Sequence, residues 1–467
     1  MSENRELRYW GQTAGMSGLP GTEAGARSLA QRPLIRAGPI AACLVLVSAT
    51  ASCASSEPAK PALELGAPPP ASTTAAALRG PEGACSSSGA ASAGLRAEPP
   101  DPDYSSEALL AHVQALSSDS LGGRLAGTVG EQLAAQYVAS KLDRAGVGPL
   151  HPDGLRIHSF PIPRLTKRGA APADKPRQAG SATPAAAVSK AISPTDAMAP
   201  ALRDSGTRPG PPDPGARTDD SRSRNVYGMV SGGGGTWGNE VVVVGAHIDH
   251  VGVRGGQIQP GADDNASGVA VTLEIAGALQ RHESELGRSI IVAFFGAEED
   301  GMLGASAFLR ERPKAAENIV AMVNVDMVGR RLADRTGLGL PMLALGIDPD
   351  RSVGVLGTKG QPVLRTLVDG ACRSAGLAAV TPEDLPGPLG KLVEAYSERR
   401  GDSWPFEFAG IPALFFSSGE SDDYHAPGDT PEKLRPELMV RRARAIHQTV
   451  VELSKLDRRG IVTPGSP

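Results

Sequence analysis

The sequence predicts an α/β protein built as a three-layer α/β/α sandwich around a mixed, mainly parallel central sheet. Short apolar runs rich in β-branched residues recur along the second half of the chain, which is typical of strands covered on both faces. Segments with helical spacing lie between these runs, and this alternation indicates helices on both sides of the sheet. Polar residues follow the ends of the runs, where ligands bind in sheets of this kind.

Four runs are the predicted strands. They are V-V-V-V at 241–244, S-I-I-V-A-F-F at 289–295, N-I-V-A-M-V-N-V at 318–325 and I-P-A-L-F-F at 411–416. Helices are predicted where apolar residues recur every three or four positions. They lie at 106–116, at 131–145 with Gly146 as a stop, in the stretch after Ser267 and at 304–310. Residues 331–400 are too irregular to assign.

Composition divides the chain into parts. The 467 residues include 57 Gly and 40 Pro, which are unevenly spread. Two stretches rich in Pro, Ala and Ser lack enough large apolar residues to offset the entropy of ordering. We therefore predict an export signal at 1–53, a disordered tether at 54–102, a folded domain at 103–460 that is interrupted by a disordered insertion at 166–224, and a tail at 461–467.

The export signal rests on a positive flank and a short apolar core. Arg32 and Arg36 precede an apolar run at 39–50, which is too short to span a membrane. The end of the export signal has two interpretations. The small residues at 49–51 fit simple cleavage and secretion, whereas T-A-S-C ending at Cys53 resembles a bacterial lipoprotein box. A lone cysteine at this place favours a lipid anchor, so we expect an exported protein of the bacterial cell envelope.

Charge and cysteine content exclude other classes. The net charge is -4 and no long basic run occurs, so nucleic acid is not an expected partner. The four cysteines form no C-x-x-C pair and no disulfide framework. The Gly-rich stretch S-L-G-G-R-L-A-G-T at 120–128 is no phosphate cradle, because it lacks a G-K-[ST] ending and a preceding strand.

Candidate metal ligands gather at the ends of the predicted strands. His247 and Asp249 end the first, Glu298 and Glu299 follow the second, Asp326 ends the third, His425 lies in the loop after the fourth, and Asp263 and Asp264 lie in the loop before a helix. Histidine and carboxylate ligands together suit zinc in a hydrolytic site. Two such metals form a clamp for hydrolysis, and three carboxylates with a hydroxide balance the charge of two zinc ions.

Several roles stay open on the residues alone. Asp263 and Asp264 both lie beside a helix start, so a helix cap is the alternative role to a ligand for one of them. Adjacent Glu298 and Glu299 do not easily bind one metal together, so one of them is a candidate general base. Asp249 is placed to orient the imidazole of His247. His250 lines the cleft or only hydrogen-bonds locally.

These residues resemble the di-zinc aminopeptidase family that contains bacterial leucyl aminopeptidase, with glutamate carboxypeptidase and glutaminyl cyclase as distant relatives. The resemblance is carried by G-A-H-I-D-H-V-G at Gly245, P-G-A-D-D-N-A-S-G at Pro260, A-E-E-D-G at Ala297, N-V-D-M-V-G at Asn324 and Y-H-A-P-G-D-T at Tyr424. It implies that His247 and Asp326 bind one zinc, that Glu299 and His425 bind the other, and that Asp264 bridges both and precedes a cis peptide.

The same resemblance assigns the remaining roles. It implies that Glu298 is the general base and that Asp249 orients its ligand neighbour. The G-D-S-W-P-F segment at Gly401 resembles the segment that lines the family's substrate cleft. Two departures stand out: Asn265 occupies a position where several members have Asp, and the insertion is too short and too polar to be a protease-associated domain.

The expected activity is that of an aminopeptidase, in which a metal-bridging hydroxide and a Glu base hydrolyse the N-terminal bond of peptide or protein substrates. One alternative is a carboxypeptidase, dipeptidase or other amidohydrolase or cyclase on the same fold. Another is a non-catalytic binding domain. The sequence leaves open the preferred side chain, the oligomeric state, the role of the insertion and the metal used in the cell.

Overall fold

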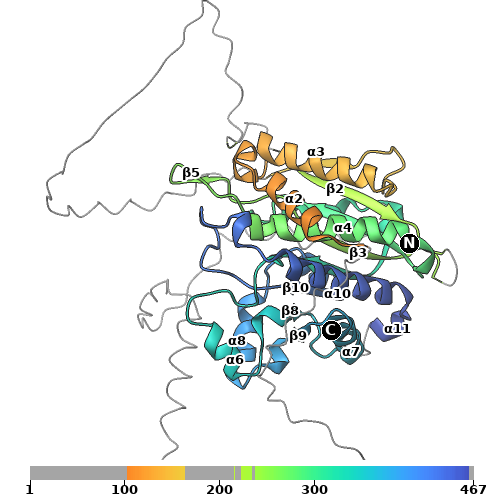
Figure 1. Ribbon diagram of the computed structural model, residues 1–467. Helices are drawn as coiled ribbons and strands as arrows, with labels where there is room; N and C mark the ends of the chain where they lie inside the picture. The colour runs from red at the N-terminus through yellow and green to blue at the C-terminus, as the bar shows by residue number, and fades with distance from the viewer. Residues whose placement is uncertain (1–102, 163–214, 216–221, 234–236, 462–467) are drawn as a thin grey trace, which may run out of the picture. The chain divides into compact units, whose positions relative to one another are not determined.

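The computed structural model describes residues 103–162, 215, 222–233 and 237–461 (Figure 1). The predicted export signal with Cys53, the predicted tether, most of the predicted insertion and residues 462–467 lie outside the described residues. Within the described ranges, no helix combines the length and apolar character needed to cross a membrane.

The core of the domain is an eight-stranded mixed sheet in the order β1-β2-β6-β3-β7-β10-β8-β9. The strands are β1 (Ile157–Pro161), β2 (Arg222–Val230), β3 (Glu240–His247), β6 (Ser289–Phe295), β7 (Asn318–Val325), β8 (Ser352–Leu356), β9 (Ala378–Val380) and β10 (Ala413–Ser417). The central strands β6, β3, β7 and β10 run parallel, whereas β1, β2 and β8 join by antiparallel pairs. A separate hairpin pairs β4 (Val253–Arg254) with β5 (Gln257–Ile258).

Helices cover both faces of the sheet. One face packs against α2 (Ser106–Leu116), α3 (Val129–Arg144), α4 (Gly268–Arg281), α7 (Pro362–Ser374) and α10 (Pro436–Lys455). Figure 1 shows α2, α4 and α10 side by side over the strands. The other face packs against α5 (Leu303–Glu311) and α9 (Ser403–Phe408). The predicted three-layer sandwich is confirmed.

The valines of β3 show how sequence produces the layers. Val242 and Val244 lie in the apolar cluster on the α4 side, and Val241 and Val243 lie in the cluster on the α5 side. Successive strand residues point to opposite faces, so a strand covered on both sides needs apolar residues at every position. Each buried valine contributes about 1.5–3 kcal/mol relative to an exposed one.

Some boundaries differ from the prediction. Strand β2 begins at Arg222, inside the predicted insertion, because its residues pair with β1 and β6. The irregular stretch after Arg331 contains α6 (Gly339–Ala344), β8, α7, β9 and α8 (Pro388–Ser397). Its strands are only five and three residues long, too short for a clear period. The last helix, α11 (Arg458–Ile461), includes the first residue of the predicted tail.

Candidate metal centre

The sheet brings the predicted ligands together at the carboxyl ends of its parallel strands. His247 is the last residue of β3, Glu299 follows β6, Asp326 directly follows β7, His425 lies after β10, and Asp264 lies in the π-helix η2 (Ala262–Ser267) that leads into α4. The peptide bond from Asp264 to Asn265 is cis, as predicted. All five side chains contribute to two groups that share one carboxylate.

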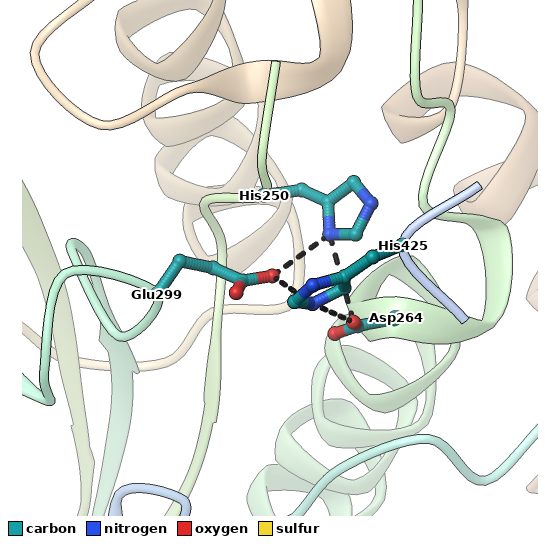
Figure 2. Close-up of side chains that lie close together, drawn as sticks. All are labelled: His250, Asp264, Glu299 and His425. Atoms are coloured by element: carbon teal, nitrogen blue, oxygen red, sulfur yellow. Dashed lines mark hydrogen bonds and ion pairs between the residues drawn. The ribbon is translucent and has the colours of Figure 1, made fainter. Parts of the chain in front are cut away.

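The first group joins His250, Asp264, Glu299 and His425. His425 Nε2 lies 3.1 Å from Asp264 Oδ2 and 3.0 Å from Glu299 Oε1. His250 Nδ1 lies 3.0 Å from Glu299 Oε1 and 3.7 Å from Asp264 Oδ2. Figure 2 shows both imidazole rings pointing toward the two carboxylates. The sequence singled out His250 without assigning it to the metal.

The second group joins His247, Asp264 and Asp326. His247 Nε2 lies 3.4 Å from Asp264 Oδ1 and 3.2 Å from Asp326 Oδ1. Asp264 therefore presents one carboxylate oxygen to each group, which is the arrangement of a bridging ligand. The group has three members, one fewer than the first.

The two groups fit metal ions. Zinc bonds of about 2.0–2.2 Å at tetrahedral angles place ligand atoms roughly 3.3 Å apart, close to the separations here. Asp264 Oδ2 and His425 Nε2 are buried, and neither has a hydrogen-bond partner within the described part of the chain. Burial opposes charge on His425, yet Asp264 and Glu299 raise its pKa to about 9. The carboxylates thus create a site that strongly favours positive charge.

The structure separates the roles of the adjacent aspartates. Asp263 lies outside both metal groups, and its Oδ1 accepts hydrogen bonds from Gly329 N at 2.7 Å and Ser267 Oγ at 3.1 Å. It ties the loop of Asp264 to the chain just after Asp326. Asn265 makes a similar link, because its Nδ2 donates to Val325 O at 3.0 Å. An aspartate carboxylate cannot make that donation.

Asp249 is predicted from the sequence to orient the imidazole of His247, but the shorter contacts of its carboxylate are with another loop. The distance from His247 Nδ1 to Asp249 Oδ1 is 3.9 Å, whereas the same nitrogen lies 3.2 Å from the Asp249 carbonyl oxygen. The carboxylate accepts the backbone N–H groups of Glu298 at 3.0 Å and Glu299 at 3.3 Å. Asp249 therefore holds the loop that carries both glutamates.

Glu298 lies outside both metal groups and beside them, as expected of a general base. Burial raises the pKa of its carboxyl well above the ordinary value, and Asp402, Asp326 and Glu299 raise it further against the effect of His247. A raised pKa makes the Glu298 carboxylate a stronger base, which suits a group that takes a proton and returns it.

Two further buried polar side chains have no assigned role, and one of them, Asp402, interacts electrostatically with Glu298. Asp402 and Asn324 are both 0% exposed, and no described residue forms a hydrogen bond with either carboxylate oxygen or either amide atom. Burial raises the pKa of Asp402 to about 7. Asn324 lies beside the backbone next to Asp402, because a Cβ on Gly401 would lie 2.9 Å from Asn324 Nδ2. Sequence reasoning placed Gly401 at the cleft but gave neither polar side chain a role.

Two further residues hold the metal loop, and sequence reasoning missed both. Asp429 accepts the backbone N–H groups of Asp263 and Asp264 at distances of 3.0–3.1 Å. Arg124 is 1% exposed and ends the 3-10 helix η1 (Asp119–Arg124). Its guanidinium donates to the carbonyl oxygens of Ile248 (3.0 Å), Pro260 (2.8 Å), Gly261 (2.9 Å) and Leu116 (2.5 Å). The Gly-rich stretch thus fastens the ligand loops.

Part of the chain is similar to known proteins. Residues 225–450 match Peptidase family M28. A probable leucine aminopeptidase of Arthroderma otae is 29% identical over 220 residues, which are 46% of this chain and 54% of the relative. A probable zinc metalloprotease of Pyrenophora tritici-repentis is 41% identical over 75 residues, 16% of this chain and 17% of the relative.

A solved structure shares the fold. The zinc aminopeptidase of Bacillus subtilis superposes with a TM-score of 0.50 at 17% identity, covering 76% of this chain and 96% of that chain. At this identity the likeness concerns the fold alone. The chain spans about half the length of the leucine aminopeptidases it matches, 54% in the case of the Arthroderma otae protein.

Proposed function

Because residues 225–450 belong to Peptidase family M28, we propose that this protein is a zinc-dependent exopeptidase, namely an aminopeptidase that hydrolyses the N-terminal bond of peptides or proteins. One observation carries the proposal: two groups of histidines and carboxylates share Asp264 at the carboxyl edge of the sheet. A shared carboxylate between two metal sites is the arrangement that two-metal hydrolysis needs.

The ligand roles follow from the two groups. His247 and Asp326 would hold one zinc ion, Glu299 and His425 the other, and Asp264 both. When bound, two zinc ions supply a water of lowered pKa and polarise the carbonyl group of the substrate. The protein contributes by fixing the ligands: Asp249 and Asp429 hold the loops on which they lie.

Glu298 carries the proton. Its carboxylate takes a proton from the attacking water as the new bond to the carbonyl carbon forms. It then gives that proton to the nitrogen of the leaving amine as the carbon–nitrogen bond breaks. Its raised pKa suits the first transfer, because a stronger base takes the proton of the water more readily.

The charge around the site favours a substrate with a free amino terminus. Glu298 and Asp402 add two carboxyl groups beyond the ligands, and Asp402 interacts electrostatically with His247 and Asp326. A carboxypeptidase needs a cation for the terminal carboxylate of its substrate. Two buried arginines near the site do not meet this need: Arg124 donates to backbone carbonyls, and Arg330 donates to Asp423 and Asp429.

The test compares free and blocked substrates. We expect aminoacyl-nitroanilides to be hydrolysed, chelation to abolish hydrolysis, and added zinc to restore it. N-acetylated peptides should resist cleavage. Equal cleavage of blocked and free peptides would instead assign the site to a carboxypeptidase, dipeptidase or other amidohydrolase. A chain that binds zinc and cleaves neither would be a binding domain.

The base is tested separately by Glu298→Gln. This variant should keep the wild-type zinc content, because Glu298 is no ligand, while kcat falls by at least about 100-fold, the lower range for general base catalysis. Zinc content by mass spectrometry and single-turnover rates measure the two effects. Wild-type rates in the zinc-loaded variant would refute the role of Glu298.

We also propose that the enzyme works outside the cytosol, anchored by a lipid on Cys53. Support comes from the positive flank, short apolar run and lone cysteine of the sequence. Labelling cells with radioactive palmitate should mark the wild-type protein and spare Cys53→Ala. Equal label in both, or none in the wild type, would leave simple secretion as the better explanation.

A further inference from the structure

His250 lies deep in the metal centre, although it is three residues beyond the ligand at the end of β3. Its side chain is 0% exposed. Its backbone N–H donates to Arg124 O at 3.2 Å, so the buried arginine loop fixes the chain at this point. Its Nδ1 faces the carboxylates, and no group in the described ranges hydrogen-bonds its Nε2. The ring therefore offers one nitrogen to the centre of the first group.

The separations around His250 match those of zinc ligands. The four donor atoms of His250, Asp264, Glu299 and His425 all lie within 4.8 Å of one another. His250 Nδ1 lies as close to Glu299 Oε1 as His425 Nε2 does, at 3.0 Å in each case. A tetrahedral zinc site places ligand atoms roughly 3.3 Å apart. His250 Nδ1 lies farther from Asp264 Oδ2 than His425 Nε2 does, at 3.7 Å against 3.1 Å, and it still belongs to the same group of four donor atoms.

Packing fixes the orientation of the His250 ring. A Cβ on Gly261 would lie 2.6 Å from His250 Cδ2 and 2.7 Å from its Cγ, so only glycine allows the ring this place. The ring also meets His425 edge to face, with centroids 5.4 Å apart and planes at 74°. An imidazole held between a backbone and a second imidazole is preorganised to bind, and Figure 2 shows it aimed at both carboxylates.

We propose that His250 is a sixth metal ligand, so that the two zinc sites are unequal. The site of His250, Glu299 and His425 has four protein ligands including Asp264, whereas the site of His247 and Asp326 has three. A site with fewer protein ligands keeps more positions open for a substrate group. The four-ligand site therefore serves to hold its metal firmly, and the three-ligand site receives the substrate. Only this last division rests on the proposed peptidase function.

The first test counts imidazoles without any mutation. X-ray absorption at the zinc edge of the wild-type protein loaded with two zinc ions should fit three imidazoles per two metals, from His247, His250 and His425. Two imidazoles per two metals would overturn the role of His250 while leaving the metal centre intact. A wild-type chain that binds no zinc would overturn the metal centre and this ligand with it.

The second test separates a ligand from a hydrogen-bond partner. In His250→Gln the amide still donates to Glu299 but is a poor zinc ligand. Loss of an outer partner costs 10–100-fold in metal affinity, whereas loss of a ligand should exceed about 100-fold for one of the two zinc ions. Zinc remaining after competition with graded chelator measures the change. A loss of no more than about 100-fold for either ion would show that His250 only hydrogen-bonds.

His112→Gln is the matched control. His112 is also buried, and its Nε2 lies 2.9 Å from Glu274 Oε1, but it belongs to neither metal group. The His112→Gln variant should therefore bind both zinc ions as tightly as the wild-type protein does. Should His250→Gln fail to fold, as judged by circular dichroism, the imidazole count on the wild-type protein still decides the question.

Discussion

Asp249 illustrates how one side chain supports the centre without touching the metal. Its two carboxylate oxygens accept the backbone N–H groups of Glu298 and Glu299, which have different roles in the proposed reaction. The carboxylate is 0% exposed, so these two hydrogen bonds are its compensation for burial. One residue therefore sets the position of both the proposed base and a proposed ligand.

Replacing Asp249 by Asn should disturb both glutamates. An amide has one acceptor oxygen, so one of the two N–H groups loses its partner, and the new NH₂ lacks an acceptor. We expect kcat to fall by about 10–100-fold, together with weaker zinc binding. Asp153→Asn is the control, because Asp153 also accepts a backbone N–H, that of Leu155 at 2.9 Å, but on the exposed surface. Equal kinetics in the two variants would contradict this role of Asp249.

Asp402 makes the stability of the zinc-free protein depend on pH. Its pKa is raised by burial from 3.8 to about 7, so the folded state binds more protons than the unfolded state between these values. Its unfavourable contribution is therefore absent below about pH 4 and grows as pH rises toward 7. Asp402→Asn carries no charge to bury. Relative to wild type, its free energy of unfolding should rise between pH 5 and pH 8, by roughly 1–3 kcal/mol.

Urea unfolding of the chelator-treated proteins at several pH values measures this difference. At pH 5 most of the Asp402 carboxyl is protonated in the folded wild-type protein, so measurements at this pH are the reference for those at higher pH. A difference that stays constant from pH 5 to pH 8 would show that Asp402 titrates near its ordinary pKa.

At the scale of elements, the centre depends on how loops are fastened to one another. The η1 loop lies against the turn that follows β3 and against the loop before α4. Gly123 is essential to this contact, because a Cβ there would lie 2.5 Å from Gly252 O and 2.7 Å from Gln259 O. Arg124 then bonds the carbonyls of the ligand loops from within, where water cannot replace it.

Arg124→Lys tests that fastening. Lysine keeps the charge but cannot reach all of the carbonyl oxygens, and each buried acceptor left without a partner costs about 1–3 kcal/mol. We expect weaker zinc binding together with a lower free energy of unfolding. Arg288→Lys is the control. Arg288 directly precedes β6, is as buried as Arg124 and also donates to backbone carbonyl oxygens, those of Ser454 and Leu456. The Arg288→Lys variant should have a lower free energy of unfolding and an unchanged zinc affinity.

The loop before α4 offers a sharper contrast between two glycines of the same conformation. Gly261 and Gly255 both have φ of 60°. A Cβ on Gly261 would meet Asp264 O at 2.3 Å and the His250 ring, whereas a Cβ on Gly255 would meet nothing within 4 Å. Both alanine variants lose about 1–2 kcal/mol through the left-handed backbone. Only Gly261→Ala should also lose zinc, as measured by chelator competition, and equal zinc content would contradict the proposed packing.

Across the whole molecule, the centre joins parts of the chain that are far apart in sequence. The parallel order β6-β3-β7-β10 places the ends of four strands side by side, so ligands from residue 247 to residue 425 converge at one edge. A metal bound here would therefore connect four of the eight strands. Without it, the clustered carboxylates and histidines lose the charge that compensates them.

Zinc should accordingly stabilise the entire domain. At a free zinc concentration 1,000 times the dissociation constant, binding to the folded state alone contributes about 4 kcal/mol. Denaturant unfolding with zinc and with chelator measures the gain. Glu298→Gln should keep this gain in stability. His425→Ala should lose most of it, because His425, unlike Glu298, belongs to a metal group. A gain retained in His425→Ala would remove this residue from the ligand set.

Sequence alone determined the layers and the edge at which the centre lies. Uninterrupted β-branched runs such as 241–244 need apolar cover on both faces, and the polar residues that end such runs must meet where parallel strands end. Local patterns carry this information because the period of a strand and the direction of its end are properties of a few consecutive residues. The predicted export and lipid anchor remain predictions from the sequence.

Tertiary structure alone decided the finer contacts. It brought His250 to Glu299, turned the Asp249 carboxylate toward the backbone of the next loop, and placed Arg124 among four carbonyls. These contacts join segments separated by 49 residues in the case of His250 and by 124 in the case of Arg124 and Ile248. No local period encodes such a separation, since a buried hydrogen bond depends on where two loops meet after the sheet has formed.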